Sequence, residues 1–339
     1  MKHKILVFTA CLLLGGMVLA QKRDIEGSRS MEGGKMITDI NIKKDIYSRV
    51  KLMKKNKDFG LIKGAIHFKT IDVGAALLGK GQGRTTVTSY AILEGLTDDD
   101  FNEIAEKFNE SFMRKLGSLG LSEIDWSEIE SAKKYPKLLE KQQDKDEVSK
   151  SVGAYKVVTV GDRPHFKMPV GNLTVFNQMK AISKSIDGPV LTYDVIVDFA
   201  RFDIDASRWR TDGYGPGYDF QTTETSANIL PQIGIEHVLN LTLGPPPVVY
   251  QSCLFYLDDA GRYDQVQLNK SIYVRENYAN DIDSFKGQMP KSMKRMITIN
   301  TSNTGTFVVK ADPEKYKRIA LEALEAYADN MIKAIEAEL

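Results

Sequence analysis

The segment after Leu96 constrains the fold most strongly, because it has the pattern of a long helix that a partner layer must cover. Thr97 followed three residues later by Asp100 makes a capping-box pattern, and acidic residues fill the first turn. Apolar residues then recur at the spacing of one helical face. The pattern predicts a helix over 97–116, closed by Gly117, with a buried stripe of Phe101, Ile104, Ala105, Phe108, Phe112 and Leu116.

Strands flank this helix. The segment TTVTSYAILEGL (85–96) precedes it and is rich in β-branched and aromatic residues, and the short segment LSEI (121–124) follows it. Asp125 with Glu128 then makes a second cap, which predicts a helix through Tyr135. A strand–helix–strand–helix run predicts a layered α/β sheet.

Further elements extend this plan in both directions. We predict a strand in 60–76, a strand in 153–160 and an amphipathic helix over 172–186. Later strands are predicted in 233–243, 246–259 and 262–277, with a turn at 259–261, and a late hairpin is predicted around Thr301–Thr304. Asp312 and Pro313 begin a final helix of about 26 residues, with a buried stripe of Tyr316, Ile319, Ala320, Ala323, Tyr327, Met331 and Ile335.

The segment VLTYDVIVDFARF (190–202) alternates apolar and polar residues, as a strand with one buried face does. Leu191, Tyr193, Val195, Val197 and Phe199 form the apolar face. The opposite face carries Thr192, Asp194, Asp198 and Ala200, interrupted by Ile196, and is predicted to be solvated. Residues 203–228 are glycine-containing and aromatic, which predicts a long loop.

These elements give an α/β (α+β) fold, in which helices cover a mixed β-sheet and a long C-terminal helix and additional hairpins complete it. Residues 59–339 are predicted to form one domain, and the polar stretch 137–150 is where two lobes would divide. Residues 21–58 are predicted to be a flexible or partly helical arm, because their apolar residues are scattered.

The first twenty residues resemble a cleavable signal peptide. MKHK supplies the positive region, a broken apolar run follows, and Val18-Leu19-Ala20 offers a cleavage site before Gln21. The run is short of the roughly 20 apolar residues of a spanning helix. After cleavage only Cys253 remains, so no intramolecular disulfide can form. An exported chain without disulfides is typical of the bacterial envelope: the periplasm, the periplasmic face of the outer membrane or the secreted fraction.

Charge balance limits the partners. The chain of 339 residues has 46 basic and 45 acidic side chains and a formal net charge of +1. Nucleic-acid binding normally requires a concentrated basic face, so no nucleic-acid partner is predicted from this balance.

The stretch GKGQGRTT (79–86) has the composition of a phosphate-binding loop but not its order. A P-loop needs GxxxxGK[ST] between a strand and a helix. Here the glycines are spaced differently and a strand follows. Glycine also suits a connection between two strands. We therefore predict a loop and no nucleotide, while Lys80 and Arg84 stay candidate binding residues.

Motifs for catalysis or metal binding are absent from the sequence. After cleavage the three histidines are isolated, no GxSxG motif occurs, and Cys253 lies within an apolar strand. No metal, cofactor or catalytic residue is therefore predicted, and an enzyme is the less favoured reading. Asp194, Asp198, Asp203 and Asp205 line up with Arg201, and two carboxylates on a strand face could serve a glycosidase or bind calcium, although the spacing is not that of a calcium loop. We name Asp198, Arg201 and Asp203 as candidate binding residues.

The loop after this strand carries further candidates, since exposed aromatics between glycines commonly anchor a partner, a ligand or a lipid interface. The alternative is that they cover their own core. The residues are Trp209, Tyr214, Tyr218 and Phe220.

The order of elements resembles an envelope α/β superfamily. The segments YAILEGL, TDDDFNEIAEKFNESFMRKLGSLG and LSEIDWSEIES, followed later by VLTYDVIVDFA and the helix PEKYKRIALEALEAYADNMIKAIE, match its plan. The superfamily includes curli-secretion-channel proteins, lipoprotein activators of penicillin-binding proteins and the N-terminal domain of the Tol-Pal β-propeller protein. The resemblance covers most of 59–338 in outline and implies an envelope protein that acts through protein contacts, with no catalytic residues to carry over. Channel and activator members are lipoproteins, whereas this chain lacks a convincing lipidation cysteine.

Three functions follow as hypotheses. The first is a non-enzymatic envelope protein that binds another envelope protein or itself, with homo-oligomers and peripheral membrane association left open. The second is a secreted hydrolase or carbohydrate-binding protein that uses Asp194–Asp205 and the aromatic loop. The third is a subunit of an outer-membrane secretion channel.

Overall fold

The computed structural model describes residues 28–30, 36–78, 85–143, 146–149, 153–161, 163–166, 172–208, 223–241, 248–285 and 301–339. Its helices are α1 (Ile42–Asp45), α2 (Asp98–Ser118), α3 (Trp126–Ser131), α4 (Tyr135–Leu139), α5 (Leu173–Ser185) and α7 (Pro313–Glu336). The strands of the first half are β1 (Ser28–Ser30), β2 (Met36–Thr38), β3 (Ile46–Arg49), β4 (Asp58–Leu78), β5 (Thr85–Glu94), β6 (Ser122–Glu123), β7 (Asp146–Ser149) and β8 (Gly153–Thr159). Those of the second half are β9 (Val190–Arg208), β10 (Thr223–Glu236), β11 (Val238–Leu241), β12 (Val248–Gln251), β13 (Cys253–Leu257), β14 (Tyr263–Leu268), β15 (Ile272–Arg275), β16 (Ala279–Ser284) and β17 (Thr301–Ala311).

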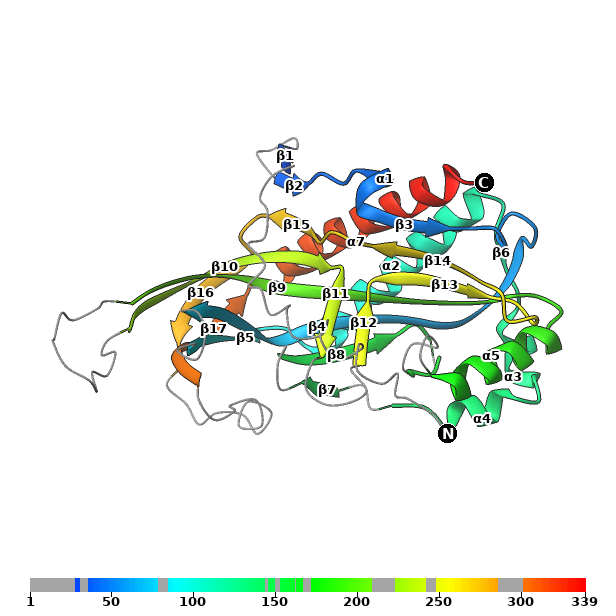
Figure 1. Ribbon diagram of the computed structural model, residues 1–339, viewed down its shortest axis with the longest axis horizontal. Helices are drawn as coiled ribbons and strands as arrows, with labels where there is room; N and C mark the ends of the chain where they lie inside the picture. Colours follow the sequence, from blue (N-terminus) through cyan, green and yellow to red (C-terminus); the bar gives the residue numbers. More distant parts are fainter. Residues whose placement is uncertain are drawn as a thin grey trace, which may run out of the picture.

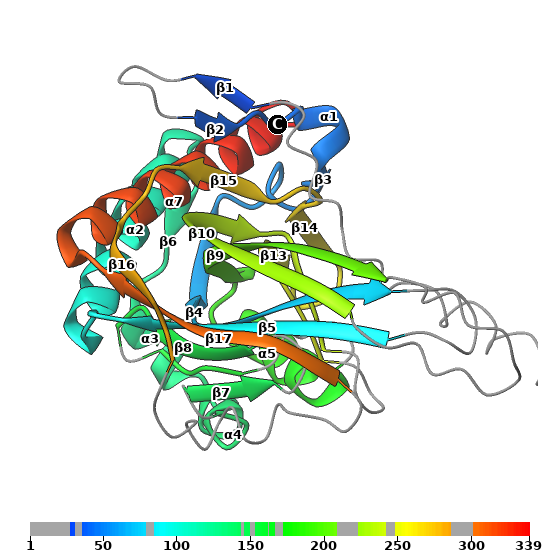
Figure 2. The same ribbon diagram turned by 90° about the vertical axis from the view of Figure 1, so that its left-hand side faces the viewer.

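Two long strands, β4 and β9, form the centre of one mixed sheet (Figure 1). Their first halves run parallel, with Gly60–Phe68 beside Val190–Val197. The second half of β4 pairs with β5 and that of β9 with β10, both antiparallel. Each long strand thus changes neighbours along its length, and the sheet curls, with β5, β8 and β17 below and β9, β10 and β13 above (Figure 2). The mixed sheet covered by helices confirms the predicted fold class.

Helices α2 and α7 cover one face of the sheet. Their apolar stripes pack against alternate residues of β4 and β9, such as Phe68, Tyr193 and Val197, in the larger hydrophobic cluster. Thr97 makes the predicted capping box with Asp100, and Asp312 caps α7. Every residue of the two predicted stripes is buried, so both helices are confirmed. Helix α2 runs one residue past Gly117 and ends at Ser118.

The shorter helices cover part of the opposite face. Residues of α3, α4 and α5 pack with Ile62, Val190 and Phe255 in a second hydrophobic cluster. These helices lie together at one end of the molecule (Figure 1). The helix predicted over 172–186 is confirmed as α5, capped by Asn172.

The prediction of one helix from Asp125 through Tyr135 is wrong. Helix α3 ends at Ser131, Ala132 is extended, and a separate helix α4 begins at Tyr135. Pro136 explains the break, because a proline inside a continuous helix would lose a hydrogen bond and clash with the carbonyl four residues earlier. The polar stretch 137–150 also contains strand β7, which pairs with β8 in the main sheet.

Residues 21–58 are predicted to be an arm, but from residue 36 onward this segment is part of the folded domain. Strand β3 pairs with β14, and the side chains of Val50, Leu52 and Met53 are buried in the core. Among the residues of this segment that the structure describes, α1 is the one helix that matches the predicted partial helicity. Sequence periodicity missed this segment because its few apolar residues are separated by lysines.

Strand β9 also differs from prediction, because both of its faces are buried from Val190 to Ala200. The predicted solvated face is wrong, since the curled sheet closes over it. The predicted loop 203–228 is shorter, because 203–208 and 223–228 extend the paired strands β9 and β10. The late hairpin is also corrected: Thr301–Thr304 lie within β17, which runs parallel to β5 and antiparallel to β16.

Candidate functional site

Charged side chains lie in a row on the face of β4 and β9 that points away from α2 and α7. Lys63, His67 and Lys69 come from β4, and Asp194 and Asp198 come from β9. All five are at most 4% exposed. The parallel register brings the two strands together, so that basic groups of one strand face carboxylates of the other.

The first cluster surrounds Asp194. The Lys63 ammonium lies 2.6 Å from Asp194 Oδ1, and His67 Nε2 lies 2.7 Å from the same oxygen. Lys63 Nζ also donates to the Phe166 carbonyl at 2.7 Å, and the His165 ring meets the His67 ring edge-on. Burial alone would raise the pKa of Asp194, but the Lys63 charge and the His67 hydrogen bond hold that pKa well below its usual range.

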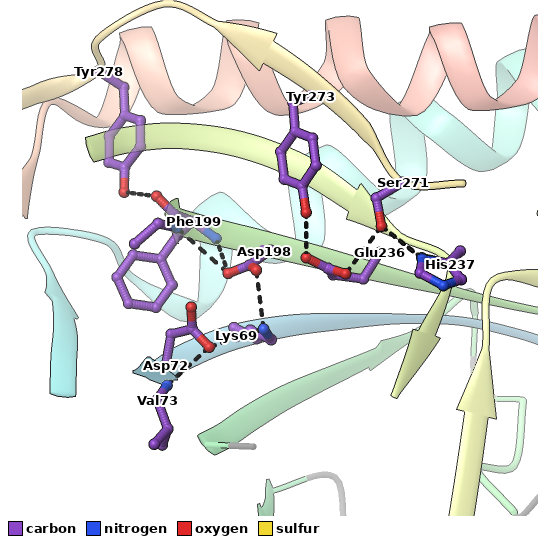
Figure 3. Close-up of polar contacts among 11 residues, drawn as sticks. Lys69, Asp72, Val73, Asp198, Phe199, Glu236, His237, Ser271, Tyr273 and Tyr278 are labelled. Carbon is purple, nitrogen blue, oxygen red and sulfur yellow. Dashed lines mark hydrogen bonds and ion pairs between the residues drawn. The ribbon is translucent and has the colours of Figure 1, made fainter. Parts of the chain in front are cut away.

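The second cluster surrounds Lys69 (Figure 3). The Lys69 ammonium lies 2.9 Å from both Asp72 Oδ1 and Asp198 Oδ2. The other oxygen of Asp198 accepts the Phe199 amide at 2.8 Å. Burial opposes a charged lysine, yet the two carboxylates outweigh it and hold the pKa of Lys69 well above its usual value.

Glu236 continues the polar row at the end of β10 (Figure 3). The Tyr273 hydroxyl donates to Glu236 Oε1 at 2.6 Å, and the Ser271 hydroxyl donates to Oε2 at 3.0 Å. Ser271 Oγ lies 2.9 Å from His237 Nδ1. Hydroxyl groups of the β15 segment therefore bind the carboxylate that ends β10.

The charged side chains of this row connect β4 to β9 and are almost inaccessible to solvent. A buried ion pair adds little net stability, because desolvation offsets its attraction, but breaking one leaves an uncompensated charge. Lys63 to Asp194 and Lys69 to Asp198 each link β4 to β9 at a defined position. We infer that these pairs favour the observed register of the two central strands.

The candidate residues named from sequence fall in different places. Asp198 belongs to the Lys69 cluster, and Arg201 is half-buried further along β9. Asp203 is opposite Asn228 in the β9–β10 pairing. The remaining candidates lie outside the described residues: Lys80, Arg84, Trp209, Tyr214, Tyr218 and Phe220.

Sequence reasoning missed Lys63 and Lys69, which define the two clusters. A signal was present, because these lysines and His67 occupy positions of one parity in an otherwise apolar strand. Such charges in a strand buried on both faces need partners of opposite charge, and β9 offers Asp194 and Asp198. Cys253 is buried as predicted, and burial raises the pKa of its thiol.

A second feature is a surface groove between α7 and the segment of β2 and β15, with a volume of about 590 Å³. Its apolar lining consists of Ile37, Ile40, Val274, Leu321 and Ala326. Ile40, Leu321 and Ala326 are only half-buried. The groove therefore leaves apolar surface of α7 open to solvent.

Acidic groups dominate the rim of this groove. Four carboxylates and two basic side chains line it, a formal excess of two negative charges: Asp39, Glu322, Glu325 and Asp329 against Arg318 and Lys333. Three ion pairs cross its edges: Arg318 pairs with Glu276, and Lys115 pairs with both Glu325 and Asp329. The groove thus combines an apolar floor with a net negative rim.

No group of three or more His, Cys, Asp or Glu side chains among the described residues could hold a metal ion. Within the described part of the chain, no helix has both the length and the apolar character to cross a membrane. No known family model matches the chain, and no curated protein or solved structure is detectably similar to it.

Proposed function

We propose that this protein is a non-enzymatic, exported envelope protein that binds another protein chain, and that the α7 groove is its binding surface. Export is proposed from the first twenty residues, and action through protein contacts is the role implied by the resemblance to the envelope superfamily. The groove supplies a surface on which such contacts could form.

The half-buried apolar floor of the groove is the observation that carries this proposal. Leu321 and Ala326 lie at the margin of the buried stripe of α7, where each packs partly against the core and is partly open at the groove. Single apolar residues are common on helix surfaces, but apolar residues that gather in one groove favour a partner that covers them. By contrast, Asp194 and Asp198 are fully buried and ion-paired.

The charge of the rim favours one class of partner. A segment with apolar anchors and flanking lysines or arginines would fill the floor and complement the negative rim. Such a segment could belong to another envelope protein or to a second copy of this chain.

The test is affinity capture from envelope extracts with residues 21–339. A Leu321→Asp variant places a charge on the floor of the groove and should lose the captured protein. Leu139→Asp is the matched control, because Leu139 is a solvent-exposed leucine of α4, 38% exposed. Equal capture by both variants, or none by the unmodified chain, would refute the groove as the binding surface.

A second candidate, a subunit of an outer-membrane secretion channel, is favoured by the length of two antiparallel strand pairs, β4–β5 and β9–β10. The β9–β10 pair runs beyond the helical layer (Figure 1), and its register extends to Arg208 and Thr223. This hypothesis requires a ring-sized oligomer of residues 21–339 in mild detergent, and a monomer under all conditions would refute it. Hydrolysis by Asp198 and Asp203 stays a prediction, which Asp198→Asn and Asp203→Asn variants test.

A further inference from the structure

A dense group of basic residues surrounds strand β3. Seven lysines and arginines occur between residues 43 and 57, with Asp45 as the one acidic residue among them. All seven side chains are solvent-exposed. We call this group the basic margin: Lys43, Lys44, Arg49, Lys51, Lys54, Lys55 and Lys57. It lies along α1, β3 and the following turn, at the upper edge of the molecule in Figure 1.

The charges of the basic margin are balanced only in part, because Arg49 interacts electrostatically with the Asp264 carboxylate and the exposed Asp58 follows Lys57. None of its six lysines forms an ion pair with any residue that the structure describes. The Asp45 carboxylate lies 3.8 Å from Lys270 and accepts the Asn41 amide. Arg49 lies over the Tyr263 ring, 5.6 Å from its centroid. The margin therefore presents a concentrated positive charge, although the whole chain is nearly neutral.

A buried support holds the lysines after β3 in place. Val50, Leu52 and Met53 point into the core and are at most 5% exposed. The Asp264 carboxylate accepts the Leu52 amide at 2.6 Å and the Met53 amide at 2.9 Å. The turn closes on itself through the bond from the Lys54 amide to the Val50 carbonyl. The exposed ammonium groups are therefore presented from a fixed backbone.

Protection of a sheet edge does not account for this pattern. Natural edge strands are often guarded by lysines within the strand itself. Here β3 pairs only with β14 among the described strands, but it contains no lysine. The six lysines lie before and after it, and Arg49 is the one charged residue within it.

The residue types favour a membrane surface over nucleic acid. Bidentate contacts with bases and phosphates favour the planar guanidinium of arginine, whereas lysine is a hydrated point charge suited to a diffuse negative potential. Clusters of four to eight basic residues bind anionic lipid headgroups in this way. Tyr47 lies within the margin and is 47% exposed, and tyrosine is enriched at membrane interfaces. We infer that the basic margin docks this protein on a membrane surface that bears anionic phospholipids. The inference rests on the export proposed above.

Vesicle sedimentation tests this inference with residues 21–339, which lack the apolar N-terminal run that would itself bind lipid. Vesicles of phosphatidylcholine with roughly one third phosphatidylglycerol are compared with pure phosphatidylcholine. We expect binding to the anionic vesicles alone, at about 0.05 M salt, and its loss at about 0.5 M salt. Binding to neutral vesicles to the same extent, or none to anionic ones, would overturn the inference.

Two quadruple variants locate the surface. Changing Lys51, Lys54, Lys55 and Lys57 to Gln should weaken vesicle binding by at least about 50-fold, since each lysine near an anionic surface contributes on the order of fivefold. The matched control changes four lysines of the α3–α4 region to Gln and should bind as the unmodified chain does: Lys133, Lys134, Lys137 and Lys141. Equal losses in both variants would contradict a specific margin. If the chain binds duplex DNA but not vesicles, the partner of the basic margin is nucleic acid and not a lipid surface.

The outcome is separable from the groove proposal. The quadruple variant at 51–57 should keep its partner in affinity capture, whereas Leu321→Asp should keep its binding to anionic vesicles. If only vesicle binding fails, the membrane inference is refuted and the groove proposal is unaffected. If only affinity capture fails, the groove proposal is refuted and the membrane inference is unaffected.

Discussion

At the scale of single residues, Asp194 shows how buried charge is balanced in this protein. Its carboxylate is fully buried between Lys63 and His67, which come from the neighbouring strand. The sequence shows Asp194 on the polar side of an alternating strand and nothing of what faces it. Its burial follows from the parallel pairing of β4 with β9, a contact across more than a hundred residues that no local pattern encodes.

Removing this charge should destabilise the fold. An Asp194→Asn variant leaves the Lys63 ammonium buried without its counter-charge, which costs about 3–5 kcal/mol. Urea unfolding followed by circular dichroism measures the change. The control is Asp283→Asn, which alters an exposed pair with Lys310 and should leave the midpoint nearly unchanged. Equal midpoints for the Asp194 variant and the unmodified protein would contradict the ion-pair description.

Acid should weaken the fold through the same residue. The folded pKa of Asp194 lies below its unfolded value of about 3.9, so its contribution is complete above that value and is lost as the pH falls through the folded pKa. We expect the free energy of unfolding to fall below about pH 4. The fall should be shallower in Asp194→Asn, and parallel pH curves for the two proteins would rule out this cause.

High pH should destabilise the fold through deprotonation of Lys69. Its folded pKa is raised, so its contribution is complete below the unfolded value of about 10.4 and is lost as the pH rises through the folded pKa. Thermal melts above about pH 10 should show a steeper loss of stability for the unmodified chain than for a Lys69→Met variant. A steeper loss in the variant would argue against a raised lysine pKa.

At the scale of elements, prediction succeeded where the signal is local. Helices α2 and α7 have caps and stripes that lie within each helix, and both were predicted nearly to their ends. The α3–α4 break shows the opposite case, because one proline ended a pattern that the caps alone had favoured. Residues 36–53 were missed for a third reason: Val50 and Met53 are buried through contacts with distant strands, and lysines obscure their pattern.

Two glycines at the ends of α2 should respond oppositely to alanine. Gly95 has a φ of 93°, and a Cβ there would lie 2.7 Å from the Ala311 carbonyl oxygen, so Gly95→Ala should cost about 1–3 kcal/mol. Gly117 is helical with no atom within 4 Å of an added Cβ, so Gly117→Ala should stabilise by about 0.4–1 kcal/mol. Thermal melts of the two variants measure both changes. A stabilising Gly95→Ala would contradict the described turn into α2.

The turn after β3 offers a test of Asp264. An Asp264→Ala variant removes the carboxylate that accepts the Leu52 and Met53 amides. Hydrogen exchange at these two amides should accelerate relative to the amides of α7, which serve as the internal reference. Unchanged protection at Leu52 and Met53 would show that the core contacts of Val50 and Met53 suffice to hold the turn.

At the scale of the whole molecule, the fold class was predictable and the placement of function was not. Alternating strands and helices indicate a covered mixed sheet, which the structure confirms. The groove forms where β2 and β15 meet α7. These elements are far apart in the sequence, so no sequence motif predicts the groove. The candidate residue Asp198 was predicted on an exposed face, but the curl of the sheet buries that face, Arg201 is half-buried, and the open apolar surface lies on α7 instead.

The central claim is that the α7 groove receives another protein chain. The direct measurement is photo-crosslinking in cells, with a photoreactive amino acid at Ala326 in the groove and, as the control, at Leu139 on α4. The account predicts a discrete protein adduct from position 326 that is absent from position 139, with a lysine- or arginine-flanked apolar segment at the crosslink. No adduct at 326, or the same adducts at both positions, would contradict it.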